Sequence, residues 1–195
     1  AVHQGCYGIS VVPDGDWMCS VCAHGLSPSN VKCFICKQPG GAMRRTPEGC
    51  YIHLVCALYT PELSLNFNQP EVLIEGIHRI SRERAELVCC ICGQRGYGCV
   101  QCSSRSCSTS FHPYCALKAG YLLTTDEKNG VFLYLCYCQE HTEKKRLKQA
   151  GRSGTSSVGE VTPKKKRRQR KKKEKEKAKT PSSAIPDTML QKWGF

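Results

Sequence analysis

The sequence lacks any long apolar run. Its longest stretch of apolar residues, from Val131 to Cys138, has only eight positions, whereas a membrane-spanning helix needs about 20. The sequence also lacks a glycine-rich phosphate-binding loop and any recognisable nucleophile motif. We therefore expect neither a membrane protein nor an enzyme.

Acidic residues are scarce toward the end of the chain. Residues 1–141 carry eleven basic and eleven acidic side chains, whereas residues 142–195 carry eighteen basic and only five acidic ones. The whole net charge of +13 therefore belongs to the second segment. Blocks of like charge repel one another and oppose folding. This imbalance predicts a basic, mostly disordered tail over residues 143–195.

Within this tail, nine of ten consecutive residues are basic, and only Gln169 interrupts the run. Such a run indicates nuclear import or a nucleic-acid-binding arm, with a merely solvated linker as the alternative. The residues concerned are Lys164, Lys165, Lys166, Arg167, Arg168, Arg170, Lys171, Lys172 and Lys173. Further on, residues 185–195 hold a small apolar cluster, which is either a short interaction motif or only the end of a fragment.

Cysteine, in contrast, is abundant, with 16 residues in 195. Many of these cysteines form Cys-x2-Cys or His-x2-Cys pairs, and such pairs indicate zinc rather than disulfides. Structural zinc usually takes four thiolate or imidazole ligands. One ordered string supplies eight such residues, enough for two zinc sites: Cys89, Cys92, Cys102, Cys107, His112, Cys115, Cys138 and His141. In this string the first histidine follows four cysteines, whereas a RING finger would place a histidine fourth.

Two further groups lie upstream. One complete set of four candidate ligands is Cys33, Cys36, His53 and Cys56. A LIM domain begins with similar spacing, but it would need another ligand near Tyr59. The earlier group comprises His3, Cys6, Cys19 and Cys22, with Trp17 two residues before Cys19.

The order and spacing of these residues resemble a PHD finger of the extended type, which ends in Cys-x2-His. Together with the strings "VHQGCYG", "GGAMRRTPEGCYIHLVCALYTPE" and "CVQCSSRSCSTSFHPYCA", residues 1–142 resemble the PHD–zinc-knuckle–PHD (PZP) module of chromatin readers. Such modules occur in Jade proteins, bromodomain-and-PHD-finger scaffold proteins and plant trithorax-like methyltransferases.

The resemblance implies a small zinc-stapled α+β fold with five parts. These are the C-terminal half of a first PHD finger (1–24), a zinc knuckle (30–60), a linker (61–86), a second, extended PHD finger (87–142) and the basic tail (143–195). Because half of the first finger is missing, we expect the chain to be an N-terminally truncated fragment with three complete Zn²⁺ sites. A single site formed by the four residues of the half finger is the alternative.

The cross-brace of PHD fingers implies how the second finger pairs its ligands. Cys89 and Cys92 would share one ion with His112 and Cys115, and the remaining four residues of the string would hold the other. Cys99 is an alternative to Cys102 as a ligand. The four cysteines left over (Cys50, Cys90, Cys99 and Cys136) are expected to be buried small apolar residues, and His24 and His78 are expected to lie on the surface.

By resemblance, the function is that of a non-catalytic zinc-binding chromatin reader in the nucleus, acting in transcription regulation. It would recognise the histone H3 tail or the nucleosome, within a chromatin-modifying complex. Three Cys₃His zinc sites would give the folded module a charge of about −3, which suits a basic peptide. The alternative is a nucleic-acid-binding protein, in which the basic tail supplies the affinity and the zinc domains act as a protein-interaction scaffold.

Overall fold

The computed structural model describes residue 4 and residues 7–9, 11–66 and 72–150 of the chain. The basic run and the apolar cluster of the tail lie outside the described residues. Within them, short helices alternate with four separate two-stranded antiparallel sheets. This architecture confirms the predicted small α+β class, in which no sheet is large enough to bury a core without further support.

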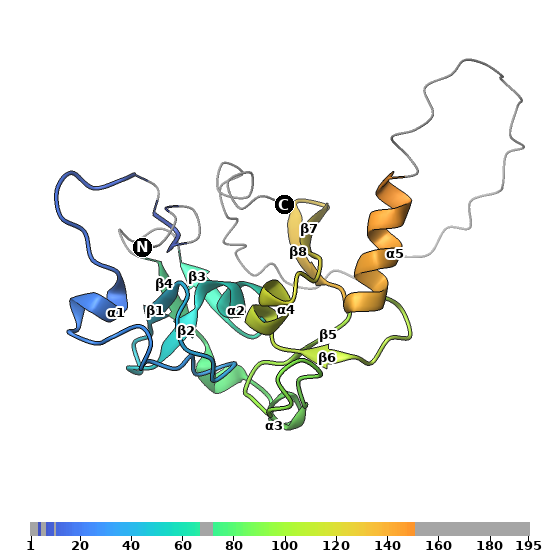
Figure 1. Cartoon of the computed structure of the whole chain (residues 1–195), viewed down its shortest axis with the longest axis horizontal. Helices are drawn as coiled ribbons and strands as arrows, with labels where there is room; N and C mark the ends of the chain where they lie inside the picture. Colours follow the sequence, from blue (N-terminus) through green and yellow to red (C-terminus); the bar gives the residue numbers. More distant parts are fainter. Residues whose placement is uncertain (1–3, 5–6, 10, 67–71, 151–195) are drawn as a thin grey trace, which may run out of the picture.

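The first half of the described chain packs around the candidate knuckle (Figure 1). Strand β1 pairs with β2, and β3 pairs with β4. Helix α2 follows β2 directly and is buried along its whole length. The elements are α1 (Ser20–Ala23), β1 (Met43–Arg45), β2 (Tyr51–His53), α2 (Leu54–Tyr59), β3 (Ser64–Asn66) and β4 (Leu73–Glu75).

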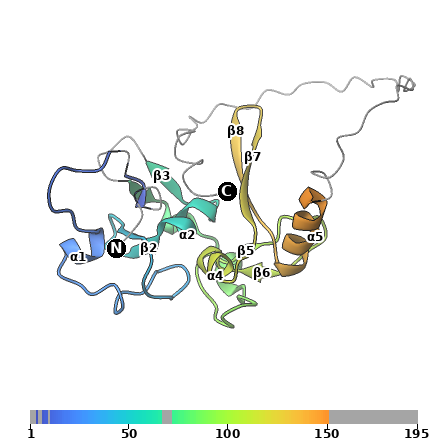
Figure 2. The ribbon, with the colours of Figure 1, turned by 45° about the horizontal axis from the view of Figure 1, so that its top comes forward.

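The second half contains the candidate extended finger. Strand β5 pairs with β6, and the longer strands β7 and β8 form a hairpin that projects from the body of the module (Figure 2). The elements are η2 (Ile77–Arg79), α3 (Arg82–Glu86), β5 (Val100–Gln101), β6 (Ser110–Phe111), α4 (Pro113–Lys118), β7 (Leu123–Lys128), β8 (Val131–Cys136) and α5 (Gln139–Ala150).

Helix α3 connects the two halves. Its N-terminus is capped by the Ser81 hydroxyl, which accepts a hydrogen bond from the Arg84 backbone N–H. The Arg84 guanidinium forms a 2.6 Å ion pair with Glu62 and also donates to the Cys99 carbonyl oxygen at 2.9 Å. Both partners of the ion pair are only about one-fifth exposed. One arginine therefore joins the segment directly after the knuckle to the second finger.

The knuckle and the second finger contain the same local motif. In each, a backbone hydrogen bond closes the Cys-x2-Cys turn. The Lys37 N–H donates to the Cys33 carbonyl oxygen, and the Gly93 N–H donates to the Cys89 carbonyl oxygen, both at 2.9 Å. Lys37 and Gly93 both have positive φ, at 59° and 69°. A short strand then leads through the histidine into a short helix that carries the last cysteine, β2 to α2 with His53 and Cys56 in one copy and β6 to α4 with His112 and Cys115 in the other. The module thus uses one zinc-binding motif twice.

The two copies pack against each other through close contacts. The ring of Phe34 stacks on that of Tyr97 with centroids 4.6 Å apart. A Cβ atom on Gly96 would lie 2.3 Å from the Ile35 carbonyl oxygen, and one on Gly98 would lie 2.5 Å from the Ile35 side chain. Only glycine permits this approach, so the loop after Cys92 is shaped to fit the knuckle.

The described helices include none with both the length and the apolar character required of a membrane span.

Candidate metal centres

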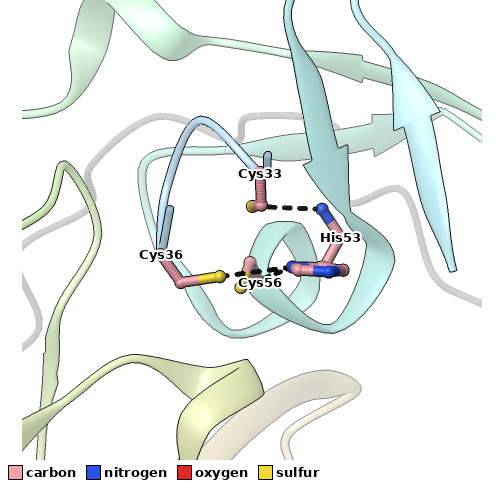
Figure 3. Close-up of side chains that lie close together, drawn as sticks. All are labelled: Cys33, Cys36, His53 and Cys56. Carbon is pink, nitrogen blue, oxygen red and sulfur yellow. Dashed lines mark hydrogen bonds between the residues drawn. The ribbon is translucent and has the colours of Figure 1, made fainter. Parts of the chain in front are cut away.

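The knuckle cluster consists of Cys33, Cys36, His53 and Cys56, all buried, with their ligand atoms within 4.8 Å of one another. Figure 3 shows the four side chains converging from the Cys-x2-Cys turn, from the end of β2 and from α2. The His53 Nδ1 atom faces the sulfurs, at 3.3 Å from Cys36 Sγ and 3.9 Å from Cys56 Sγ. On the other side of the ring, Nε2 lies 2.6 Å from the Gly40 carbonyl oxygen. This second contact fixes the ring with Nδ1 free for a metal.

The second cluster consists of Cys89, Cys92, His112 and Cys115, again within 4.8 Å. Its histidine also presents Nδ1, at 3.5 Å from Cys92 Sγ and 3.8 Å from Cys115 Sγ. The Nε2 atom of His112 is buried and has no hydrogen-bond partner among the described residues. It lies beneath Gly96, where a Cβ atom would come within 2.4 Å of it.

The third cluster consists of Cys102, Cys107, Cys138 and His141. The His141 Nδ1 atom lies 3.1 Å from Cys138 Sγ and 3.5 Å from Cys102 Sγ. Cys138 follows strand β8 and His141 lies in the first turn of α5. The hairpin and the last described helix therefore meet at this cluster.

The same backbone contact recurs in all three clusters. The first cysteine of each accepts a 3.4 Å hydrogen bond on its sulfur from a later backbone N–H, namely His53 to Cys33, His112 to Cys89 and Cys138 to Cys102. Hydrogen bonds to sulfur favour the thiolate, which is the form that binds metal.

Three thiolates packed this closely repel one another unless a cation lies between them. The contact with Cys115 lowers the pKa of Cys89 to about 2, while the same contact raises the pKa of Cys115. In the knuckle, burial alone would raise the pKa of Cys33, but contacts with Cys36, Cys56 and His53 outweigh it and hold that pKa well below its usual value. Crowded thiols thus ionise unequally when no cation is near. A Zn²⁺ ion would stabilise all three thiolates of a cluster together.

Three sulfurs and one imidazole nitrogen are a typical donor set for tetrahedral structural zinc. Each cluster therefore could hold one zinc ion with four protein ligands. The second and third clusters interleave along the sequence, because residues 102–107 lie between the two halves of the second cluster. The knuckle cluster, in contrast, takes all its members from residues 33–56.

The half finger is described only in part. His3 and Cys6 lie outside the described residues. Cys19 is half-buried just before α1, and Cys22 is exposed within it. Trp17 packs edge-on against the buried ring of Tyr7, with centroids 5.0 Å apart.

The cysteines outside the clusters differ from expectation. Cys99 and Cys136 are buried, as predicted, but Cys90 is exposed and Cys50 is half-buried. The prediction of burial was therefore wrong for Cys90. The Cys89 side chain points into the cluster, and Cys90 follows it in the turn with its side chain directed outward. Cys102 lies in the third cluster and Cys99 does not. His24 and His78 are exposed, as predicted.

Two important neighbours of the clusters were not found from the sequence. Tyr114 stacks on the ring of His53, with centroids 3.8 Å apart and planes inclined by 17°. Gly96 allows the loop to approach both Ile35 and His112. In the sequence, Tyr114 stands directly before Cys115 and Gly96 stands in the loop after Cys92, and neither position indicates the contact that the residue makes.

Comparison with known proteins identifies the family. Residues 31–141 match the model of a PHD-zinc-finger-like domain. The chain belongs to the PHD-zinc-finger-like family. This PHD-like chain is 41% identical over 144 residues to zebrafish Jade-1 and 36% identical over 164 residues to the PHD finger protein rhinoceros of Drosophila melanogaster. These alignments cover 72% and 80% of the chain, but only 17% and 5% of the two relatives.

Two further similarities bear on function. Human Jade-2, named an E3 ubiquitin-protein ligase, is 39% identical over 144 residues, which are 73% of this chain and 18% of that relative. The crystal structure of the zebrafish PHF14 PZP module matches with a TM-score of 0.54 and 26% identity, covering 77% of this chain and 83% of that structure. The PHD-like chain therefore has the PZP type of fold and spans less than a third of the length of these curated relatives.

Proposed function

We propose that this PHD-like chain is a non-catalytic, zinc-stabilised chromatin reader that binds the histone H3 tail in the nucleus and serves in transcription regulation. The observation that carries the proposal is the match over residues 31–141 to the PHD-zinc-finger-like family, together with three four-membered Cys/His clusters in those residues. The twelve clustered residues are the proposed zinc ligands.

The composition of the clusters argues for a structural role. A catalytic zinc site has three protein ligands and keeps one position open for water or substrate. Each cluster here offers four protein ligands, so a bound zinc ion would be fully coordinated. The name of human Jade-2 includes ubiquitin transfer, and the experiment below tests this chain for that activity.

The mechanism proposed is capture of an extended peptide by strand addition. Strand β5 pairs on one side with β6 and, among the described strands, with no other. Gln101 in this strand is exposed. Three zinc sites with three thiolates each would give residues 1–141, whose formal charge is otherwise zero, a charge of about −3. An acidic surface attracts the basic residues of a histone tail.

One observation favours the alternative, nucleic-acid binding. On helix α5, Lys144, Lys145 and Lys148 line a surface depression of about 350 Å³ together with Ser104 and His141. This basic face lies at the end of the folded module, directly before the basic tail. It would extend a phosphate-binding surface from the tail onto the helix.

Titration separates the two functions. An N-terminal H3 peptide and a DNA duplex of random sequence are each titrated against the full chain and against a version ending at Ala150. Peptide affinity that survives truncation, with DNA affinity largely abolished, supports the reader. DNA affinity that falls on truncation, without measurable binding of the peptide to the full chain, supports the nucleic-acid-binding protein. Ubiquitin transfer in an assay with E1 and E2 enzymes would contradict the non-catalytic assignment.

A further inference from the structure

A groove of about 430 Å³ separates the β7–β8 hairpin from the knuckle. Four consecutive residues of β8, from Phe132 to Leu135, line one side of it. Because successive side chains of a strand point to opposite faces, a groove that touches all four follows the edge of the strand. The hairpin therefore presents the edge of β8 to the groove.

The opposite wall of the groove is also a strand edge. Leu63, Ser64 and Leu65 line it consecutively, and the last two belong to β3. Strand β3 pairs with β4 and strand β8 pairs with β7, and each is the edge of a two-stranded sheet. At the base of the hairpin, the Cys136 carbonyl oxygen of β8 accepts a hydrogen bond from the Ser103 N–H, but Cys136 does not line the groove. Free edges are templates for an added strand.

The floor of the groove holds a polar atom without a partner. Tyr59 is 3% exposed and lines the groove, and its ring packs edge-on against Tyr134 of the opposite wall at 5.5 Å. Its hydroxyl is buried and forms no hydrogen bond with any described residue. Buried polar groups in native proteins are nearly always paired. An occupant with a polar group on an apolar side chain would satisfy this hydroxyl.

The chain itself contains a suitable segment. Residues 185–195 combine Met189, Leu190, Trp193 and Phe195 with one acidic and one basic side chain, in contrast to the strongly basic run before them. In an extended strand, Met189, Trp193 and Phe195 would share one face. The indole of a tryptophan combines a large apolar ring with an N–H donor. Trp193 could therefore fill the apolar groove and donate a hydrogen bond to the Tyr59 hydroxyl oxygen.

The intervening chain is long enough. Between Ala150, the last residue of α5, and Ile185 lie 34 residues, which when fully extended span up to about 110–120 Å. This length exceeds any dimension of so small a folded module. From these observations, we propose that residues 185–195 bind as an added strand in the groove between β3 and β8, with Trp193 at Tyr59.

The first test follows Trp193 by fluorescence in the full chain carrying Trp17→Phe, which leaves Trp193 as the sole tryptophan. The proposal predicts emission at short wavelength and protection from acrylamide quenching. Leu133→Glu, which places a charge in the groove, should shift the emission to longer wavelength and abolish the protection. The matched control is Val131→Glu on the same strand, because Val131 is half exposed and does not line the groove. Measured zinc content shows that both variants stay folded.

The second test uses a labelled peptide of residues 185–195. The full chain carrying Trp193→Ala and Phe195→Ala should bind this peptide, and the unaltered chain should bind it at least roughly tenfold more weakly, because a tethered segment competes at an effective concentration in the millimolar range.

Equal affinities, or a Trp193 signal that Leu133→Glu does not change, would overturn the proposal. Loss of protection on serial dilution would also overturn it, in favour of exchange between two copies. Binding of an H3 peptide but not of this peptide would assign the groove to the histone tail instead.

Discussion

The imidazole ring of His53 stacks almost parallel on the phenol ring of Tyr114, with centroids 3.8 Å apart. His53 belongs to the knuckle cluster, and Tyr114 precedes Cys115 of the second cluster. The contact therefore joins two candidate zinc centres through one pair of rings. Tyr114 also covers Gly41, where a Cβ atom would lie 2.8 Å from the tyrosine hydroxyl oxygen.

Replacing Tyr114 tests this link. Tyr114→Ala removes the stacked ring and should lower the free energy of unfolding by about 2 kcal/mol, the size expected for a partly buried aromatic residue in contact with another ring. Chemical denaturation measures the change. Tyr114→Phe keeps the ring and is the matched control, and equal stability of the two variants would show that the stacking contributes nothing.

The zinc content of the chain should be three ions, one for each four-membered cluster. Cys89→Ala should remove one ion and unfold the second finger, because metal binding and folding are coupled in such domains. Cys90→Ala, its exposed neighbour, should retain all three ions and alter stability by less than about 0.5 kcal/mol. Elemental analysis with circular dichroism measures both. If Cys90→Ala loses an ion and Cys89→Ala does not, the proposed ligands are displaced by one residue.

Gly96 is expected to tolerate no side chain. A Cβ atom there would meet the Ile35 carbonyl oxygen at 2.3 Å and His112 Nε2 at 2.4 Å. Gly96→Ala should therefore cost about 2 kcal/mol or more, since backbone would have to move. Gly93→Asn is the control, because that site is open and asparagine tolerates positive φ. A Gly96→Ala protein as stable as Gly93→Asn would contradict this account of the packing.

The four cysteines left over from the ligand pattern, Cys50, Cys90, Cys99 and Cys136, should differ in reactivity. Burial raises the pKa of both Cys99 and Cys136 to about 12, so at pH 8 these two remain protonated thiols. Because the thiolate is the reactive form, iodoacetamide should modify Cys90 and Cys50 in the zinc-loaded protein well before the buried pair. Peptide mass mapping gives the order. Early modification of Cys136 would show that the base of the hairpin opens.

The basic run is tested by changing Lys164, Lys165, Lys166, Arg167 and Arg168 together to alanine. If the run binds DNA, affinity should fall, and the log–log slope against salt should become shallower by about 0.9 for every phosphate that the variant no longer neutralises. Nuclear accumulation should fall as well. Both are measured, by titration at several salt concentrations and by imaging of a fluorescent fusion. If neither changes, the run is a solvated linker.

Ligand spacing made much of this molecule predictable. A two-residue gap between ligands is local, so pairs such as Cys33 with Cys36 can be recognised without knowledge of the fold. Their grouping depends on longer gaps, and the family pattern supplied it. The same twelve residues gather in the structure, and their role as ligands stays a prediction until zinc is counted. The domain boundaries stay predictions as well.

What the sequence did not reveal depends on packing between distant segments. Tyr114 and His53 are 61 positions apart, and no local periodicity connects them. Gly96 resembles a loop glycine until Ile35 is seen beside it. Cys90 and Cys136 both adjoin candidate ligands, yet one lies at the exposed turn and the other beneath the hairpin. Burial of these two cysteines therefore depends on whether another segment of the chain packs over the side chain, and the local sequence does not show this.

The interleaving of the second and third clusters has a consequence for how the chain is held together. If the backbone were cut between Cys107 and His112, each of the two zinc ions would still have two ligands on either side of the cut. The metals would then replace the missing peptide bond, and the nicked finger would come apart only on addition of a chelator. A cut between Cys56 and Cys89 is spanned by no cluster of the described residues, so noncovalent contacts between protein groups, including the ring pair of His53 and Tyr114, would have to keep the two pieces together.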